Sequence, residues 1–157
     1  MPDDQELWRQ IYESKQVQIG VRAIIFDSTG RKILVERNLG ALEKYVNFPG
    51  GGLELGESIE QCISREMIEE IGIPILDFKF LFLVENFIPF DGEYLHGIEL
   101  YCEVKLGTDD VDAQIEGYDF YWLAVDNLSD ADLKPIIVRD LIVDGTYRNI
   151  RHLVTRN

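Results

Sequence analysis

The apolar residues of this chain follow two periods, one typical of strands and one typical of helices. Short runs of β-branched and aromatic residues, bounded by turn-forming residues, indicate the strands. The expected strands cover residues 17–27, 32–37, 78–87, 98–104 and 120–125. Ser28–Gly30 predicts a turn after which the second strand returns along the first, and Asp91–Gly92 predicts a turn between the third and the fourth. The third strand is apolar on both faces, as expected in a sheet that is covered on both sides.

Three other segments place their apolar residues on one side of a helix. They are residues 1–15, about 58–71 and 133–143. Ser58 and Gln61 have the spacing of a capping box, and Gly72 marks the end of the middle helix. Pro135 must lie in the first turn of the last helix, where its missing N–H is tolerated. Strands interleaved with helices indicate an α/β layered domain with a mixed sheet, in which the Gly-rich segment 49–56 is a loop.

The middle helix has carboxylates on its apolar side. At about 100° per residue, Glu66 and Glu70 fall in the middle of the apolar stripe and Glu69 lies at its edge. A charge run is usually a solvated face, but the outward side of this helix is already occupied by other polar residues. These are Glu60, Gln61, Ser64 and Arg65. Because burying adjacent carboxylates is costly without a cation, the pattern predicts a site for a hard divalent ion, Mg²⁺ with Mn²⁺ as its substitute.

A glycine triplet, Gly50–Gly52, precedes this helix. Such triplets also occur in ordinary loops, so its position is what gives it weight. Glycine lets the backbone pass close to a metal or a ligand, where a carbonyl could serve as a further ligand.

The net charge of the chain limits the kinds of molecule that it is expected to bind. Its 157 residues include 15 Lys and Arg against 29 Asp and Glu, a formal net charge of −14. Polymeric nucleic acid and anionic membranes need an electropositive surface, so neither is expected as a partner. No apolar stretch approaches the roughly 20 residues that span a bilayer, and the acidic start lacks the pattern of a signal peptide. Cys62 and Cys102 have no metal-binding spacing and indicate reduced thiols, which favours a cytoplasmic protein.

One stretch resembles a known family signature, the Nudix box of the Nudix hydrolases. Its spacing matches at every defined position, Gly51-x5-Glu57-x7-Arg65-Glu66-Met67-x-Glu69-Glu70-x-Gly72-Ile73. The segment Phe48-Pro49-Gly50 and the strand that contains Trp122-Leu123 are also similar to this family. The resemblance implies an α/β/α sandwich with a central mixed β-sheet. It implies a single domain over residues 1–157, with a core at about 17–143 between a short N-terminal helix and a C-terminal tail.

The resemblance also implies an activity. This would be the metal-dependent cleavage of a diphosphate linkage in a small nucleoside-diphosphate-linked substrate, such as a nucleotide sugar, an ADP-ribose-like compound or a nucleoside triphosphate. By similarity, Glu66, Glu69 and Glu70 would be metal ligands, together with the backbone carbonyl of Gly50. A divalent ion there would offset the diphosphate charge and lower the pKa of a bound water.

Similarity to the family assigns supporting roles as well. Glu57 would steady the loop, and Arg65 would orient the catalytic carboxylates. The carboxylate that accepts the proton of the water differs between family members, so two candidates are open. Glu69 lies beside the metal ligands, whereas Glu116 lies in an acidic loop and is otherwise a solvated acid.

Four residues are candidates for contact with the substrate. Arg37, at the end of its strand, would pair with a phosphate or would be a surface cation. Tyr45 and Phe48 would stack on a base or ribose or would belong to the core. His96 would line a pocket or would be a hydrogen-bonded structural histidine.

Two alternatives to an enzyme of small nucleotides stay open at this point. One is a catalytically silent nucleotide-binding Nudix-like regulatory domain, although an intact box argues against it. The other is an RNA-decapping relative, which the charge of −14 opposes.

The distribution of charge raises a question of assembly. Residues 106–132 contain eight acidic side chains and no Lys or Arg, whereas residues 146–157 contain Arg148, Arg151 and Arg156 and no acid. Both segments can simply be solvated. Alternatively they pair within the chain or across a homodimer.

Overall fold

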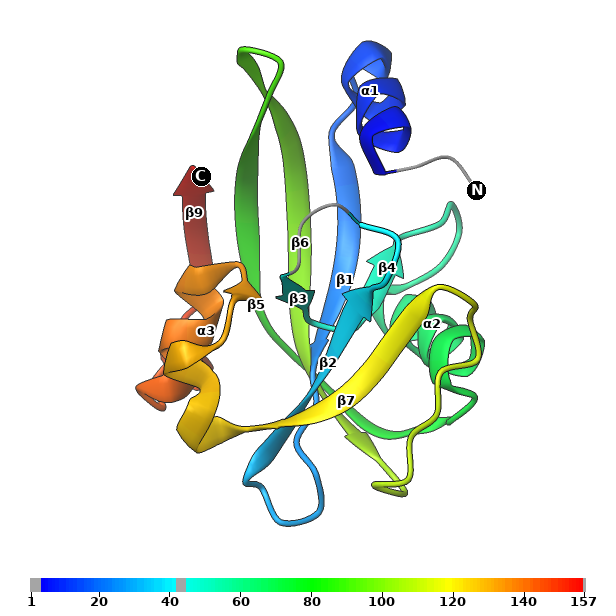
Figure 1. Cartoon of the computed structure of the whole chain (residues 1–157), viewed down its shortest axis with the longest axis vertical. Coiled ribbons are helices and arrows are strands. Elements are labelled where there is room, and N and C mark those ends of the chain that lie inside the picture. The colour runs from blue at the N-terminus through cyan, green and yellow to red at the C-terminus, as the bar shows by residue number, and fades with distance from the viewer. Residues whose placement is uncertain (1–3, 42–44, 157) are drawn as a thin grey trace.

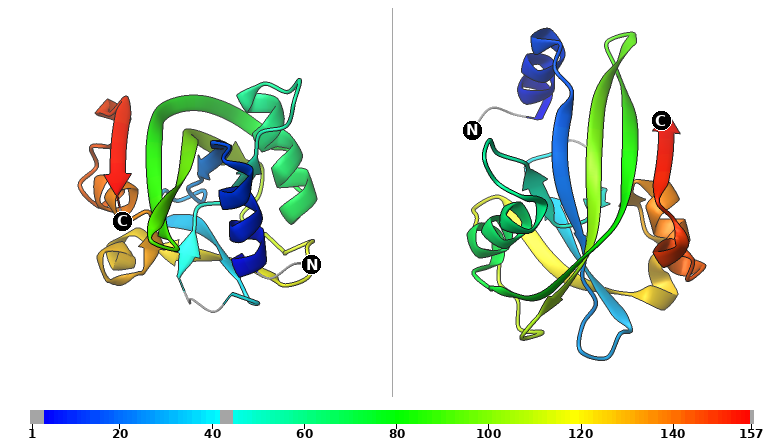
Figure 2. Two further views of the ribbon diagram at one scale, coloured as in Figure 1. Left: turned by 90° about the horizontal axis from the view of Figure 1, so that it is seen from above. Right: turned by 180° about the vertical axis from the view of Figure 1, so that it is seen from behind.

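Two mixed β-sheets form the centre of this computed structural model, which describes residues 4–41 and 45–156 (Figure 1). The elements in chain order are α1 (Asp4–Ser14), β1 (Gln18–Ile24), β2 (Lys32–Asn38), β3 (Val46–Asn47), β4 (Gly50–Gly52), α2 (Ile59–Ile71), β5 (Ile75–Phe90), β6 (Glu93–Leu106), β7 (Tyr118–Ala124), β8 (Leu133–Lys134), α3 (Ile136–Val143) and β9 (His152–Arg156), with short 3₁₀ helices at Val125–Asp130 and Tyr147–Asn149. One sheet has the order β4-β1-β6-β5-β9 and the other the order β7-β2-β3-β8. Helices α2 and α3 lie on opposite sides of the sheets (Figures 1 and 2). The expected mixed α/β fold is therefore confirmed.

The strands divide differently from the expected arrangement. Strands β1 and β2 were predicted to form a hairpin in one central sheet, but they belong to different sheets. Their backbones meet beside the turn, at the bridge between Phe26 and Ile33 and in the hydrogen bond from Leu34 N–H to the Ile25 carbonyl (2.9 Å). The right-handed twist of long strands separates the two ends of such a pair, so each end finds another partner. Strand β1 instead pairs in parallel with β6, and antiparallel with β4.

Strand β4 also departs from the prediction, since the glycine triplet was expected in a loop. Gly50 lies opposite Arg22, and Gly52 lies opposite Gly20. The pairing fixes the glycines against the sheet directly before α2, which brings the segment close to the carboxylates of that helix.

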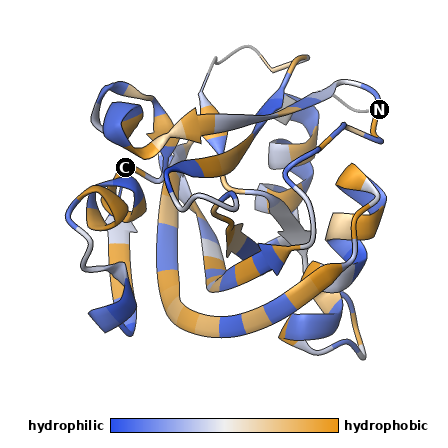
Figure 3. Ribbon diagram, turned by 90° about the horizontal axis from the view of Figure 1, so that it is seen from below, coloured by the Kyte–Doolittle hydropathy of each residue, from blue (hydrophilic) through white to orange (hydrophobic). Residues whose placement is uncertain are grey.

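Apolar side chains from both sheets pack into two cores, and apolar and polar positions alternate along the strands (Figure 3). The core under α2 includes Val21, Ala23, Ile25, Cys62, Ile63, Met67 and Cys102. The core under α3 includes Ile24, Phe48, Phe82, Tyr101, Val138 and Ile142. Both faces of β1 and β6 are thus covered along their inner parts, which is why their inward residues are almost all apolar.

Helix α2 begins and ends where its sequence predicts. Gln61 N–H donates to the Ser58 hydroxyl (3.1 Å), and Ser58 N–H donates to the Gln61 side chain (2.8 Å), which completes the capping box. Gly72 ends the helix in the left-handed conformation at φ 71°. Helix α3 is shorter than expected, because Leu133–Lys134 pairs with β3 and Pro135 lies just before the first turn.

The C-terminal segment does not pair with the acidic segment 106–132 in the contacts that the structure describes. Strand β9 pairs in parallel with β5, and its His152 contacts Glu85 at 2.7 Å. Arg148 makes two hydrogen bonds to Glu103, each 3.0 Å long. The alternative of a pairing with the acidic segment within the chain is therefore wrong for Arg148, whose partner Glu103 lies outside that segment.

Two further findings concern the expected environment. No helix in the described ranges is both long and apolar enough to cross a membrane. Cys62 and Cys102 are free and buried, and burial raises the pKa of each thiol to about 12. Neither thiol is therefore activated for chemistry at neutral pH.

Candidate active site

Glu66, Glu69 and Glu70 on α2 differ in their exposure, as the helical pattern predicts. The side chains of Glu66 and Glu69 are 12% and 55% exposed, and Glu70 is 7% exposed. Helix α2 packs on β1 and β4, so its inward turn brings Glu66 and Glu70 against the glycine strand. Glu69 lies at the edge of this group of glutamates, and its side chain is directed toward solvent.

Arg65 joins the loop before α2 to the glutamates on it. Its Nε and Nη2 atoms donate to the two carboxylate oxygens of Glu57 at 3.1 and 2.7 Å. Its Nη1 donates to Glu66 (2.8 Å) and Glu69 (3.3 Å), and Nη2 also donates to the Gly52 carbonyl (3.0 Å). A planar guanidinium with several fixed donors holds carboxylates in one geometry better than a single ammonium could. We call these residues the Arg65 cluster: Gly52, Glu57, Arg65, Glu66 and Glu69.

Glu57 is held from both sides. Besides Arg65, the backbone N–H of Glu54 donates to its carboxylate at 2.8 Å. The hydrogen bonds from Arg65 are the main reason why the pKa of Glu57 falls to about 2. Glu57 is therefore a stable anion that fixes the loop, as its predicted supporting role requires.

Glycine is needed where the strand β4 meets its neighbours. Gly50 has a φ of 152°, and a Cβ there would collide with the backbone of Val21. A Cβ at Gly51 would occupy the place of the Glu66 carboxylate. The backbone thus approaches Glu66 in a way that only glycine permits.

A second arginine lies in the interior, and sequence reasoning missed it. The Nη1 atom of Arg22 donates to Glu36 and to the Phe48 carbonyl, both at 3.2 Å, and its Nε lies 3.7 Å from Glu99. Glu36 is 6% exposed, and burial raises its pKa to about 7 although Arg22 opposes the shift. We call these residues the Arg22 cluster: Arg22, Glu36, Phe48 and Glu99. The available signal for Arg22 was a charged residue within the β-branched run expected to form the first strand.

Glu70 lies between the two clusters. Burial raises its pKa to about 9, and the charges of Glu36 and Glu66 add to the effect. One of its oxygens, Oε2, is buried and has no hydrogen-bond partner among the described residues. A buried carboxylate with an unused oxygen and acidic neighbours needs a proton or a cation.

The donor set fits a hard divalent cation in its chemistry. Carboxylates of Glu66, Glu69 and Glu70 offer oxygen ligands, and the Gly51 position leaves room for the Glu66 carboxylate beside the backbone. In the conformation described for residues 4–41 and 45–156, no three His, Cys, Asp or Glu side chains form a ready metal site. Arg65 Nη1 contacts both Glu66 and Glu69 there.

The candidate substrate residues lie in separate places. Phe48 is fully buried and packs edge-on against Tyr101 at 5.5 Å, so of its two expected roles the structure agrees with the core position and not with stacking on a base. Its backbone carbonyl instead accepts a hydrogen bond from Arg22. Arg37 pairs with Asp119 at 3.1 Å, and its Nε atom is buried and lacks a partner among the described residues.

Tyr45 is half-buried and directly follows residues 42–44, which lie outside the described ranges. Glu116 is exposed before β7 and makes no described contact with the glutamates of α2. Its segment is nevertheless attached to that helix, since Gln114 N–H donates to the Glu70 carbonyl at 2.7 Å. The role of Glu116 stays a prediction.

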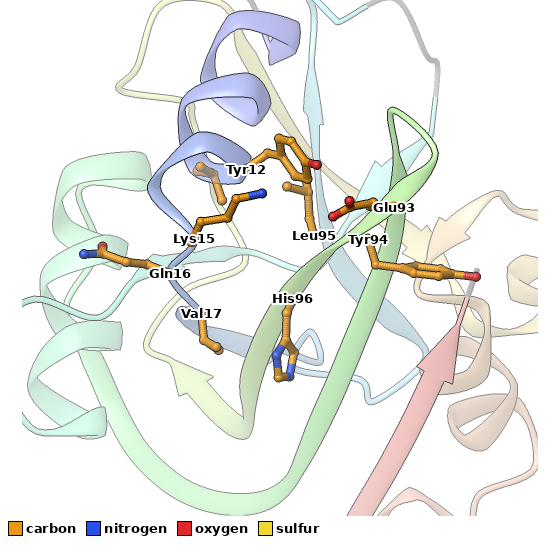
Figure 4. Close-up of a pocket in the computed structure, with 9 residues that line it drawn as sticks. Tyr12, Lys15, Gln16, Val17, Glu93, Tyr94, Leu95 and His96 are labelled. Carbon is orange, nitrogen blue, oxygen red and sulfur yellow. The ribbon is translucent and has the colours of Figure 1, made fainter.

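His96 lines a pocket of about 210 Å³ between the end of α1 and the start of β6 (Figure 4). Tyr12, Lys15, Val17 and Tyr94 are among the other residues that line it. The ring of His96 stacks on Phe87 at 4.5 Å, and its Nε2 has no partner within the described part of the chain. His96 therefore lies beside a pocket, and its role in substrate binding stays a prediction.

The fold and the site together define an α/β protein. Its candidate active site lies where the glutamates of helix α2 meet the glycines of strand β4. A model of the NUDIX domain matches residues 16–141. The chain therefore belongs to the Nudix family.

Similar proteins and structures agree with this assignment. The chain is 41% identical over 56 residues to the protein "Nucleoside diphosphate-linked moiety X motif 6" of Mus musculus, which covers 36% of the chain and 18% of that protein. It is 26% identical over 125 residues to the NAD-capped RNA hydrolase NudC of Pseudomonas aeruginosa, covering 76% of the chain and 41% of NudC. It is 31% identical over 93 residues to the 8-oxo-dGTP diphosphatase of Buchnera aphidicola, covering 59% of the chain and 69% of that enzyme. The chain thus spans less than half the length of the first two relatives.

Solved structures show the same fold. The MutT structure from work on Aliivibrio salmonicida and Vibrio cholerae has a TM-score of 0.64 and 24% identity, covering 86% of this chain and all of that one. The NUDIX domain of Shewanella oneidensis NrtR, complexed with ADP ribose, has a TM-score of 0.65 and 17% identity, covering 92% of this chain and 96% of that one.

Proposed function

We propose that this protein is a metal-dependent pyrophosphohydrolase that cleaves a diphosphate linkage in a small nucleoside-diphosphate-linked compound. The observation that carries the proposal is the buried Glu70, with an unpartnered oxygen, beside the mostly buried Glu66 inside an intact Nudix box. Membership of the Nudix family supports the reaction class.

Glu66, Glu69, Glu70 and the Gly50 carbonyl would hold the cation, Mg²⁺ or its substitute Mn²⁺. When bound, a divalent ion neutralises phosphate oxygens and lowers the pKa of a bound water. Arg65 holds the carboxylates in position, and Glu57 fixes Arg65 through two hydrogen bonds. Glu69, exposed at the edge of the cluster, or Glu116 would accept the proton of the attacking water.

The names of the relatives suggest the substrate class but leave its identity open. They concern NAD-capped RNA, 8-oxo-dGTP and bound ADP ribose, which share a nucleotide with a diphosphate or longer phosphate chain. The net charge of −14 opposes a long RNA chain, so a small nucleotide is favoured. The buried free cysteines support a cytoplasmic location, and a homodimer stays a prediction.

A hydrolysis screen tests the proposal. Nucleotide sugars, ADP-ribose, dinucleoside polyphosphates and nucleoside triphosphates would be incubated with Mg²⁺ or Mn²⁺, and the products identified by mass. We expect release of a nucleoside monophosphate or of phosphate, and loss of that release in Glu70→Gln. Glu60→Gln is the matched control, because Glu60 is on the exposed side of the same helix.

Equal turnover by the wild type and Glu70→Gln would contradict the metal assignment. Nucleotide binding without any hydrolysis would instead indicate the alternative, a catalytically silent regulatory domain.

A further inference from the structure

The five-stranded sheet carries a polar area that the proposed chemistry does not use. Asn86 on β5 lies opposite Gly97 on β6, and Gly20 on β1 lies opposite Glu99 on β6. Opposite residues and residues two apart project from the same face of a sheet. Arg22, two residues after Gly20, is therefore on this face too. We call these five residues the polar floor, and their strands lie side by side in Figure 2.

Gly20 and Gly97 contribute no side chain to the middle of the polar floor. Among residues 4–41 and 45–156, no side chain lies within 4 Å of the point where a Cβ would stand at Gly20 or Gly97, and the atoms closest to these points are backbone oxygens. Glycine within a strand weakens it and often marks the close approach of a ligand. A ligand group could therefore reach the backbone between Asn86 and Glu99.

Asn86 has an unsatisfied side chain. The residue is 8% exposed, and its Oδ1 atom is buried without a hydrogen-bond partner in the described part of the chain. Leaving a buried polar atom unpaired costs about 1–3 kcal/mol. Since most buried polar atoms in native proteins are paired, this one calls for a partner from outside the chain.

The charges around Asn86 restrict the kind of partner. Glu99 is 22% exposed and shares the single guanidinium of Arg22 with Glu36. Its Oε2 accepts from the Tyr101 hydroxyl at 3.3 Å, and its other oxygen has no described partner. With two carboxylates around one cation, the area repels a phosphate and favours an uncharged group that donates hydrogen bonds. Carboxylates bind ribose hydroxyls in this way in dinucleotide sites.

We infer that the polar floor binds sugar hydroxyls of the substrate, with Asn86 and Glu99 as acceptors. The inference rests on the proposed function, since it names which part of a nucleoside-diphosphate-linked compound lies on the sheet. The phosphates then point away from Glu99, toward the glutamates of α2. A site built to pair hydroxyls rejects compounds that lack them, by up to about 10⁴-fold in known cases.

Binding measurements on the whole chain in EDTA test the inference without catalysis. Two pairs of probes differ in their sugars: ATP against 2′-deoxyATP for the nucleoside ribose, and ADP-ribose against ADP for the distal sugar. Titration calorimetry should show that the wild type prefers the first member of one pair at least tenfold, which also identifies the sugar. Asn86→Leu should weaken binding of that preferred compound at least tenfold and leave its partner compound unchanged.

The melting temperature separates binding from structure. Because Asn86→Leu replaces an unpaired amide with an apolar group of similar size, its melting temperature should stay equal or rise. Asn127→Leu, on an exposed residue of the 3₁₀ helix Val125–Asp130, is the control and should change neither affinity nor preference.

The inference is overturned if the wild type shows no preference within either pair, or if Asn86→Leu keeps the wild-type preference. A lower melting temperature with unchanged affinity would assign Asn86 a structural role instead. Hydrolysis in the screen above with no effect of Asn86→Leu on binding would reject the subsite and keep the proposed reaction. Sugar-dependent binding without hydrolysis would keep the subsite and reject the proposed reaction.

Discussion

The Arg65 cluster and the Arg22 cluster solve the same problem, which is to hold several carboxylates close together, in different ways. Arg65 contacts residues that are at most 13 positions away in the chain, and its Glu57 bonds are short and paired. Arg22 contacts residues 36, 48 and 99 at 3.2–3.7 Å, in the interior between strands. The two guanidiniums are about equally exposed, at 25% for Arg22 and 24% for Arg65. The clusters differ in their partners: Arg65 holds carboxylates of one loop and one helix, whereas Arg22 joins strands of both sheets and pairs with Glu36, which is 6% exposed.

This difference predicts whether replacing each arginine affects mainly the activity or mainly the stability of the protein. Replacing Arg65 should affect activity more than stability, because it positions candidate metal ligands and one of them, Glu69, is 55% exposed and keeps its solvation. Replacing Arg22 should affect stability first, because Glu36, which is 6% exposed, has little solvent to replace the lost guanidinium.

The largest expected effect is on stability, from Arg22→Met. Glu36 and Glu99 would lose their cation, and the free energy of unfolding should fall by about 3 kcal/mol, measured by urea denaturation. Arg148→Met is the matched control: its partner Glu103 is partly exposed, so a loss of less than about 1 kcal/mol is expected. Equal losses in the two variants would remove the distinction between buried and surface arginines.

The next effect is on activity, from Arg65→Met. Without the guanidinium, Glu66 and Glu69 lose their orientation, and kcat should fall about 10- to 100-fold. The melting temperature should fall less than in Arg22→Met, since Glu69 and part of the loop are exposed. Arg31→Met, on an exposed turn residue, should leave kcat unchanged. A larger stability loss in Arg65→Met than in Arg22→Met would invert the comparison.

The smallest effect is a pH dependence of opposite sign in the two clusters, measured on metal-free protein. The lowered pKa of Glu57, about 2, stabilises the fold above the unfolded pKa of about 4.3, and this is lost as the pH falls toward 2. The pKa of Glu36 is raised to about 7, so its carboxyl stays protonated to a higher pH in the folded chain than in the unfolded chain. Stability from this group therefore falls as the pH rises from about 4.3 to 7.

Glu57→Gln should flatten the acid part of the stability curve, and Glu36→Gln the part between about pH 4.3 and 7. Denaturation midpoints across this pH range measure both. An unchanged slope between pH 4.3 and 7 in Glu36→Gln would contradict the buried state of that carboxyl.

The same contrast explains what the sequence could predict. Helix α2, its capping box, the end at Gly72 and the inward glutamates all depend on neighbours within one or two turns, so their spacing is visible in the chain. The Arg22 cluster combines β1, β2 and β6, and only the separation of the first two strands into different sheets creates it. Phe48 shows the same limit, since the sequence left both a ligand contact and a core position open, and only its packing against Tyr101 places it in the core.

Strand β9 has a consequence for how this protein behaves at high concentration. The five-stranded sheet has long inner strands, but its two outer strands are short: three glycines in β4, and the five residues of β9, which carry His152 and Arg156. An open sheet edge invites strands from other molecules, and short or basic edge strands discourage them. By pairing with residues 83–87 in the middle of β5, β9 interrupts the free edge of the longest strand in the sheet, which is expected to discourage aggregation through strand addition.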